Sequence, residues 1–290
     1  MNVDRINAET RLGGLLASPA AQSASPAIYN AAFAVLGLNC CYLAFDVKEE
    51  DFSAAMQAVR ALNMFGVNIS MPYKTLTVGH MDSLSPAAEL IGAVNTVRQR
   101  DGYLEGHNTD GAGFVANLRA QGVDIRGMSM LQVGAGGAGA AVATQCALDG
   151  IGSLTLFNKR DAFFPAAERL AARITQKTGV AVTLLDLDDR QALEAAVGAS
   201  DLVVNTTNVG MGKLAHLSVV EEAAWFREGT VVADTVYHPA KTKLLTLAET
   251  RGCRIMLGEG MLIHQAAECF RIFTGLPLPA ISEEIYMKKP

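Results

Sequence analysis

A glycine-rich hexapeptide is the first segment whose residue types and spacing suit chemistry. Residues 134–139 are Gly-Ala-Gly-Gly-Ala-Gly, a G-x-G-x-x-G pattern that follows an apolar run and opens an alanine-rich segment. Glycines so placed allow a tight turn and let backbone N–H groups and a helix N-terminus approach a pyrophosphate. A packing turn would also use glycines, but the flanking strand and helix patterns favour a dinucleotide site. We expect loop contacts at Gly134, Ala135, Gly136, Gly137 and Ala138.

The end of the next strand-like run bears on the choice of cofactor. About twenty positions beyond such a loop, an acidic residue commonly binds the ribose 2′-hydroxyl. Here Phe157 and Asn158 are followed by Lys159, Arg160 and Asp161. The two basic residues suit a 2′-phosphate, although they would also fit a solvated turn, whereas Asp161 would repel a phosphate and accept from a hydroxyl. We therefore expect NAD(H) as the cofactor, with NADP(H) tolerated.

Short polar side chains recur where strand-like runs give way to helical ones. Taken singly, each fits an ordinary role: Ser25 and Asp110 suit helix N-caps, Asn95 a turn, and Lys74 an exposed helix position. Taken together, they supply many short hydrogen-bond donors and acceptors at places from which side chains can face a cleft. The residues are Ser23, Ser25, Asn68, Ser70, Lys74, Asn95, Thr96, Asn108, Thr109 and Asp110.

The middle of the chain alternates between strand-like and helix-like segments, which would position the glycine loop. Residues 164–178, for example, carry apolar side chains at helical spacing on one face. Such alternation predicts a mainly parallel sheet covered on both sides. The expected strands are at residues 130–133, 154–157, 181–185, 202–204 and 230–233.

The first hundred residues alternate less regularly and predict a separate α/β unit. Strands are expected at residues 41–47 and 65–69, with a helix at 51–62 between them. The pairs Ser25-Pro26 and Met71-Pro72 resemble helix starts, since proline is tolerated in the first helical turn. A helical pattern after residue 261 is expected to pack back on this unit.

We therefore predict an α/β protein of two domains with a cleft between them. Residues 1–111 would form an N-terminal α/β substrate-binding and catalytic domain, completed by C-terminal helices at 261–290. Residues 112–260 would form a Rossmann-type, doubly wound parallel-sheet domain that binds the dinucleotide. Short hinges are expected near residues 110–113 and 258–260.

Composition narrows the class of protein. A length of 290 residues suits two domains, and a formal charge of −5 without a basic stripe makes nucleic acid an unexpected partner. The polar N-terminus lacks the apolar core of a signal peptide, and residues 127–148 are too rich in glycine for a membrane span. We expect a cytoplasmic protein, either monomer or homodimer. Five cysteines and five histidines without metal-ligand spacing predict neither disulfides nor a metal.

Eight segments together resemble the shikimate dehydrogenase family, in the same order and spacing and over nearly the whole chain. Residues 158–164 (NKRDAFF) and 70–72 (SMP) are most similar to its quinate/shikimate dehydrogenase branch. The eight segments are Gln22–Pro26 (QSASP), Asn68–Lys74 (NISMPYK), Gly92–Thr96 (GAVNT), Gly106–Gly111 (GHNTDG), Val133–Ala138 (VGAGGA), Asn205–Thr207 (NTT), Tyr237–Pro239 (YHP) and Met261–Gln265 (MLIHQ).

The resemblance implies a role for each matching residue. Lys74 and Asp110 would be the catalytic pair, and the nicotinamide would lie near loops at residues 205–211 and 258–261. Two residues depart from the family pattern: Gln22 replaces the usual histidine, and Ser70 replaces the threonine of the commoner branch. The implied substrate contacts are Ser23, Ser25, Asn68, Ser70, Asn95, Thr109, Tyr237 and Gln265. Further cofactor contacts are expected at Asn158, Thr206, Asn208, Gly258 and Met261.

The chemistry asks for such a pair. Removing hydride from a secondary alcohol must be matched by loss of the hydroxyl proton, so a group that accepts and returns a proton has to lie within hydrogen-bond reach. We expect Lys74 to carry that proton, and Asp110 to orient the lysine and bind a substrate hydroxyl. The predicted reaction is reversible oxidation of shikimate, quinate or both to the 3-dehydro ketone.

Four alternatives stay open at this point. A strictly NADP-dependent biosynthetic shikimate dehydrogenase would share most of these motifs, as would an aminoshikimate dehydrogenase. A protein of another class, which binds nucleotide or metabolite on the same fold without turnover, would have no use for the lysine and aspartate. An α/β domain whose glycines form only a packing turn would show no affinity for NADH.

Overall fold

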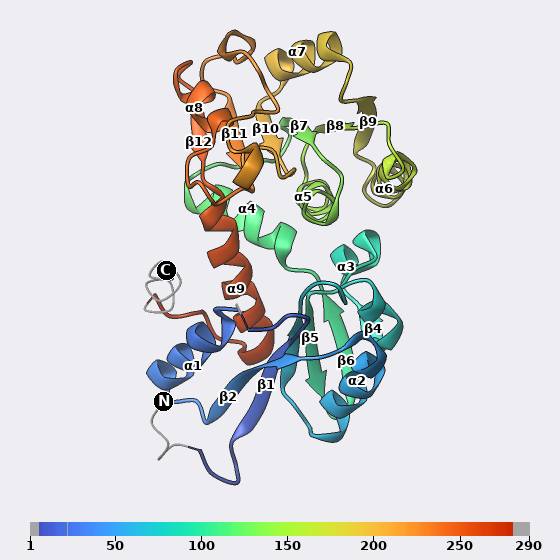
Figure 1. The fold of residues 1–290 in the computed structure, drawn as a ribbon, viewed down its shortest axis with the longest axis vertical. Helices are drawn as coiled ribbons and strands as arrows, with labels where there is room; N and C mark the ends of the chain where they lie inside the picture. Colours follow the sequence, from blue (N-terminus) through green and yellow to red (C-terminus); the bar gives the residue numbers. More distant parts are fainter. Residues whose placement is uncertain (1–5, 22, 281–290) are drawn as a thin grey trace. The chain divides into compact units, whose positions relative to one another are not determined.

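The structure, a computed structural model, describes residues 6–21 and 23–280. Gln22 and residues 281–290, the end of the expected C-terminal helices, therefore lie outside the description. The chain forms two compact units, residues 1–109 with 265–290 and residues 110–264, each built around its own six-stranded sheet (Figure 1). In the described part of the chain, no helix combines the length and apolarity needed to cross a membrane. The predicted α/β class is confirmed.

The first unit mixes short strands with short helices. Its strands are β1 (Arg11–Ala17), β2 (Cys40–Asp46), β3 (Gly66–Ile69), β4 (Ser83–Leu84), β5 (Thr96–Arg100) and β6 (Tyr103–His107). Its helices are α1 (Ser25–Leu36), α2 (Phe52–Ala61), α3 (Pro86–Ile91) and the 3₁₀ helices η2 (Glu49–Asp51) and η3 (Leu76–His80). The unit also includes α9 (Gly258–Thr274) from Gln265 onward.

The two expected helix starts in this unit have different outcomes. Helix α1 begins at Ser25 with proline in its first turn, as predicted, although Ala24 and not Ser25 takes the N-cap position. The expected helix at Met71-Pro72 is wrong. There the chain still pairs with the end of β1: the Ser70 N–H donates to the Leu16 carbonyl at 3.1 Å, and the Met71 carbonyl accepts from Ser18. Because these groups are used, a turn follows and η3 starts only at Leu76.

The strand order of the first sheet brings the ends of several strands to one edge. The order is β2-β1-β3-β5-β6-β4, with β1, β2 and β3 parallel and β5 antiparallel to both β3 and β6. The start of β5 therefore lies beside the ends of β3 and β6, and Thr96 pairs with Asn68 on one side and His107 on the other. Residues that follow β3 and β6 or precede β5 consequently share one edge.

Helices cover both faces of this sheet. Helix α1 and the last turns of α9 pack on one face, where Tyr29, Phe33 and Phe270 form a buried aromatic cluster (Figure 1). Helices α2 and α3 pack on the other face against Val67 and Val97. Apolar burial on two faces explains why these strands show a weaker alternating pattern than a one-sided sheet would.

The second unit is a doubly wound sheet with all neighbouring strands parallel. Its strands are β7 (Ser129–Val133), β8 (Ser153–Asn158), β9 (Ala181–Asp186), β10 (Leu202–Asn205), β11 (Val231–Asp234) and β12 (Arg254–Met256). Its helices are α4 (Asp110–Ala120), α5 (Gly137–Leu148), α6 (Phe164–Thr178), α7 (Arg190–Ala199), α8 (Lys243–Glu249), the 3₁₀ helices η4 (Gly212–Leu214) and η5 (Ala223–Trp225), and the first turns of α9.

Successive strand residues in this unit face opposite layers. Met130 packs with α4, α5 and α6, while its neighbour Leu131 packs with α7 and α8. Leu202 and Val203 divide between the same two layers. The order β12-β11-β10-β7-β8-β9 is that of dinucleotide-binding sheets, which reverse direction between the first and fourth strands. Here that reversal lies between β7 and β10, so the loops after these two strands border the expected ligand crevice.

Candidate active site

Four of the predicted substrate residues form one hydrogen-bonded network in the first unit. Asn68 donates from Nδ2 to the Asn95 carbonyl at 3.3 Å. Asn95 donates from Nδ2 to Thr109 Oγ1 at 3.1 Å, and its Oδ1 accepts from the Thr109 N–H at 2.9 Å. Thr109 Oγ1 donates in turn to Gln265 Oε1 at 3.3 Å. Asn68, Asn95 and Thr109 are buried and Gln265 is half-buried, so the network ends in an amide that is partly open to solvent.

Three predicted serines lie in the same unit, two of them in loops and Ser25 at the first position of α1. Ser23 Oγ accepts from the Ser25 N–H at 3.2 Å just before α1, which fixes the entry of the chain into that helix. Ser70 follows β3 and is held through its backbone to Leu16. All three side chains are half-buried, as a residue that contacts both protein and ligand would be.

The predicted catalytic residues come from different units. Lys74 lies in the turn between β3 and η3, and its carbonyl accepts from the Val94 N–H at 2.8 Å, which ties this turn to the loop before β5. Asp110 is the first residue of α4, where the helix dipole favours a negative charge. Both side chains are half-buried. Their pairing remains a prediction.

Predicted residues near the start of α9 are placed differently from the loop that the sequence suggested. Residues 258–261 form the first turn of α9 and not a loop. The glycine at 258 is explained by close packing of this turn, because a Cβ on Gly258 would lie 2.4 Å from the Val236 carbonyl oxygen. Met261 is largely buried in the core of the second unit. Tyr237 is exposed in the same unit, with its ring centroid 5.0 Å from that of His238.

The glycine loop is held tightly at its two ends. A Cβ on Gly139 would lie 2.4 Å from the Gly134 carbonyl oxygen, and Gly134 itself has a φ of +97°. Thr206, directly after β10, donates its N–H to the Val133 carbonyl and its hydroxyl to the Gly134 carbonyl, both at 2.9 Å. The loops after β7 and β10 are therefore in contact at the reversal point of the sheet.

The middle of the glycine loop is open. A Cβ built on Gly136 or Gly137 would meet no atom of the described chain within 4 Å. Helix α5 begins here, and Ala135 and Ala138 add only methyl groups. Free space beside the N–H groups of a helix N-terminus is what a pyrophosphate needs. These residues therefore fit a dinucleotide.

The segment after β8 carries the residues predicted to lie near the cofactor's ribose. Asn158 Oδ1 accepts from the Ala135 N–H at 3.2 Å, which joins this strand end to the glycine loop. Arg160 pairs with Asp186 at 3.4 Å and lies over the Phe164 ring at 4.8 Å. Asp161 Oδ1 accepts from the Phe163 N–H at 2.9 Å, and its side chain, like that of Lys159, is exposed.

A buried carboxylate braces the loops after β10 and β11. Asp234 accepts from Asn205 Nδ2 and the Val236 N–H, both at 2.9 Å, and from Thr242 Oγ1 at 2.7 Å. Asn205 also binds Thr207 and the Val209 carbonyl, so the turn that carries Asn208 is fixed from below. Burial raises the pKa of Asp234 to about 6, and the three donors only partly oppose this effect.

The raised pKa predicts a pH-dependent contribution to stability. The folded protein binds the Asp234 proton more tightly than the unfolded chain, whose carboxyl has a pKa near 3.8. The contribution is therefore fully present below pH 4 and is lost as the pH rises through 6, by about 3 kcal/mol at most. Asp234→Asn keeps the shape without the charge. We expect the free energy of unfolding of Asp234→Asn, relative to the parent, to rise between pH 4.5 and 7.5 in urea titrations. A falling difference would mean that the hydrogen bonds outweigh burial.

Several residues of these sites were absent from the sequence prediction. Gln132 donates from Nε2 to the carbonyls of Gly134 and Gly139 and so closes the glycine loop; a glutamine inside an apolar strand was the available signal. Tyr42 donates from its hydroxyl to Asn68 Oδ1 at 2.7 Å. Cys269 lies four residues after Gln265, one helical turn on, and contacts the same network. Asp234 was indistinguishable from an ordinary polar strand end, whereas Asn205 was named only as part of the Asn205–Thr207 segment.

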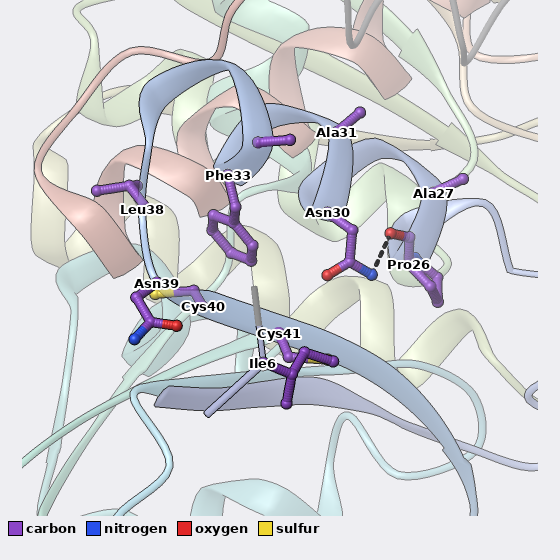
Figure 2. Close-up of a pocket in the computed structure, with 11 residues that line it drawn as sticks. Ile6, Pro26, Ala27, Asn30, Ala31, Phe33, Leu38, Asn39, Cys40 and Cys41 are labelled. Atoms are coloured by element: carbon purple, nitrogen blue, oxygen red, sulfur yellow. Dashed lines mark hydrogen bonds between the residues drawn. The ribbon is translucent and has the colours of Figure 1, made fainter. Parts of the chain in front are cut away.

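A separate pocket of about 610 Å³ lies between α1 and β2 (Figure 2). Its wall is mostly apolar and includes Ile6, Phe33 and Leu38. The amide of Asn30 is already engaged, because it donates to the carbonyls of Pro26 and Tyr42, both at 2.8 Å, and accepts from the Tyr42 N–H. This pocket contains none of the predicted substrate residues and does not suit a polyhydroxylated acid.

A Rossmann-type sheet with an open glycine loop at its reversal point, together with a separate unit that concentrates amide and hydroxyl groups, defines an NAD(P)-dependent dehydrogenase. Comparison with known proteins agrees. Residues 15–97 match the family model described as the shikimate dehydrogenase substrate binding domain. A shikimate dehydrogenase (NADP(+)) of Listeria monocytogenes is 42% identical over 276 residues, which cover 95% of each chain. A quinate/shikimate dehydrogenase of Escherichia coli is 42% identical over 94% of this chain and 95% of its own.

A solved structure extends the similarity to the fold. The shikimate 5-dehydrogenase of Listeria monocytogenes, determined in complex with shikimate and NAD, superposes with a TM-score of 0.93 at 42% identity, over 98% of this chain and 97% of that one. The chain therefore belongs to the shikimate dehydrogenase family. It is an oxidoreductase that uses NAD or NADP.

Proposed function

We propose that this protein catalyses the reversible oxidation of a ring hydroxyl of shikimate and quinate to the 3-dehydro ketone, with NAD favoured over NADP. The observation that carries this proposal is the network of Asn68, Asn95, Thr109 and Gln265, which presents amide and hydroxyl groups beside the turn that bears Lys74. Relatives named for shikimate, and for quinate and shikimate together, support the substrate class.

The residues of the chain divide the task between binding and proton transfer. A bound nicotinamide supplies the acceptor, or in reverse the donor, of hydride. In the oxidation direction the amine of Lys74 takes the hydroxyl proton of the substrate, and in the reduction direction its ammonium returns that proton to the ketone oxygen. Asp110 orients Lys74 and accepts from a neighbouring substrate hydroxyl. The amide-rich network discriminates among polyols, because a missing partner leaves buried polar groups unpaired.

The proposed preference for NAD rests on the segment after β8. Arg160, the stronger phosphate ligand of the two basic residues, is drawn toward Asp186 and Phe164 within the same unit. Asp161 is exposed beside it and places a negative charge where a 2′-phosphate would bring more. A 2′-hydroxyl, by contrast, can donate to that carboxylate.

Initial rates with purified protein over the four combinations of shikimate or quinate with NAD or NADP test the proposal. Turnover of both acids, faster with NAD, is the expected result, followed by the absorbance of the reduced cofactor. Turnover of shikimate alone with NADP favoured would assign the strictly NADP-dependent biosynthetic role. Binding of NADH without turnover of either acid would refute the proposed reaction.

Asp161→Asn is expected to shift cofactor preference toward NADP by roughly tenfold in the ratio of kcat/KM values, because a charge repelling the 2′-phosphate is removed. The new amide retains an oxygen that can accept from the Phe163 N–H. Glu168→Gln, which removes an exposed charge from α6, serves as the matched control and should leave the ratio unchanged. An unaltered ratio in Asp161→Asn would remove this residue from cofactor selection.

A further inference from the structure

A buried thiol lies at the centre of the substrate network. Cys269 is fully buried on α9, one turn after Gln265. Its Sγ lies 3.1 Å from Asn68 Nδ2, 3.0 Å from Thr96 Oγ1 and 3.2 Å from Thr109 Oγ1. Burial raises the pKa of this thiol, so it stays protonated and acts as a weak hydrogen-bond donor and acceptor.

Counting protons assigns the donors around the sulfur. Thr96 has one hydroxyl proton, which it donates to Asn95 Oδ1 at 2.9 Å, so the contact between Thr96 and Cys269 uses the thiol proton. The amide of Asn68 is oriented by the Tyr42 hydroxyl, which donates to Oδ1 and leaves Nδ2 facing the sulfur. The thiol therefore donates to Thr96 and lies beside the Asn68 amide, whose two protons it shares as acceptor with the Asn95 carbonyl and Thr96 Oγ1.

The same count directs the Thr109 hydroxyl to Gln265. Asn95 Oδ1 already accepts from the Thr96 hydroxyl and from the Thr109 N–H, both at 2.9 Å, which fills its two lone pairs. The Thr109 proton then has two acceptors left, Gln265 Oε1 at 3.3 Å and the sulfur at 3.2 Å. An amide oxygen is a much better acceptor than sulfur, so the proton goes to Gln265.

We propose that Cys269 is a positioning residue for substrate recognition: its sulfur, 3.2 Å from Thr109 Oγ1 and 3.9 Å from Gln265 Oε1, fixes the amide of Gln265 with Oε1 held by protein and Nε2 presented to an oxygen of the substrate. The proposal rests on the proposed function and deepens it, since it makes Gln265 a donor to a hydroxyl or carboxylate oxygen. A thiol suits the position because it fills the space among three polar neighbours and supplies one donor and a weak acceptor.

Two substitutions at Cys269 give opposite expectations for positioning and for packing. Cys269→Ser retains a donor and an acceptor but is smaller, whereas Cys269→Val fills a similar volume and has neither. We expect Cys269→Ser to keep the KM values for shikimate and quinate within about threefold, and Cys269→Val to raise them roughly tenfold or more, with kcat and the KM for NAD little changed. Parent-like KM values in Cys269→Val, with or without a defect in Cys269→Ser, would overturn the proposal.

Control variants isolate the path through Gln265. Cys146 on α5 is also fully buried, and in the described part of the chain its sulfur makes no hydrogen bond, so Cys146→Val should leave the substrate KM values unchanged. In a Gln265→Ala background, Cys269→Val should add no further effect, because the group it positions is gone. Additive losses in the double variant would contradict an action through Gln265.

A spectroscopic readout separates this proposal from the proposed function. The Nε2 amide signals of Gln265, assigned by their loss in Gln265→Glu, can be followed by NMR without substrate. We expect these signals to be shifted in Cys269→Val and retained in Cys269→Ser. Unchanged signals in Cys269→Val overturn the positioning role, whatever the enzyme oxidises; failure of the parent protein to oxidise either acid overturns only the proposed function.

Discussion

Replacing Lys74 with alanine is expected to lower kcat for both shikimate and quinate by a factor of roughly 10²–10⁴, the usual contribution of a positioned acid–base group. The loss should appear in kcat, because the proton moves only as the hydride does. The Kd for NADH, measured by fluorescence titration, should stay unchanged, because the nucleotide contacts proposed here come from the second unit. A lysine placed on the turn after β3, with its backbone tied to Val94, meets the requirement for a fixed proton carrier.

A variant of Asp110, the carboxylate proposed to pair with Lys74, is the second part of this experiment. Asp110→Asn removes the charge that we propose orients Lys74, so it should lower kcat by less than Lys74→Ala does. The double variant Lys74→Ala with Asp110→Asn should be little worse than Lys74→Ala alone, because residues that act as a unit are not additive. Independent, multiplying losses would show that the two residues do not form a pair.

A lysine outside the predicted site serves as the control for a general effect of charge. Lys48 is an exposed lysine of the same unit, just after β2, and Lys48→Ala removes the same charge outside the predicted site. Its kcat should equal that of the parent. An unchanged kcat in Lys74→Ala would exclude Lys74 as the proton carrier and would transfer that role to another group.

The sequence predicted the second unit more completely than the first, for a physical reason. A strand buried on both faces, such as β7 or β10, is a continuous apolar run between helical patterns, and such runs can be recognised in one sequence. The helix predicted at residues 164–178 is α6 with the same bounds. In the first unit, strand β4 has only two residues and helix α3 only six, and elements that short carry little periodicity.

The Met71-Pro72 segment shows why local rules fail where tertiary hydrogen bonds compete. Proline favours a first helical turn, but the Met71 carbonyl accepts from Ser18, which is more than fifty positions away in the sequence. No local pattern reports such a partner. The error at residues 258–261 is the reverse, a helix where a loop was expected. The glycines that suggest a loop are instead needed for the close approach of this helix to Val236 and Asn117.

The site was predicted as a set of residues and not as a network. The family resemblance placed Asn95, Thr109 and Gln265 among the substrate contacts, and the structure joins them through hydrogen bonds. It could not identify Cys269, because a buried cysteine in a helix is ordinarily a small apolar residue. What distinguishes Cys269 is the pairing of β3 with β5, which brings Asn68 and Thr96 to the same sulfur.

Two glycines of the same loop should respond to substitution in different ways. Gly136→Val is expected to raise the Kd for NADH by roughly 100-fold or more, since two lost hydrogen bonds to an anionic group, at about 1.5 kcal/mol each or more, amount to at least about 3 kcal/mol. The thermal midpoint should remain that of the parent, because a Cβ at Gly136 meets nothing within 4 Å in the described chain and its φ of −70° suits any L-residue. Fluorescence titration and thermal unfolding measure the two quantities.

Gly139→Ala should instead destabilise the protein even without cofactor. Its Cβ would lie 2.4 Å from the Gly134 carbonyl oxygen and 2.7 Å from Thr206 Oγ1, so α5 or the loop has to move, at about 1–3 kcal/mol for overpacking. Alanine's better helix propensity, about 1 kcal/mol, offsets part of this cost. Gly79→Val, at an open position of the first unit, should match the parent in both measurements. If Gly136→Val bound NADH normally, the pyrophosphate could not lie at this loop. If Gly139→Ala were fully stable, the loop would not be closed as tightly as the contacts among Gly134, Gly139 and Thr206 require.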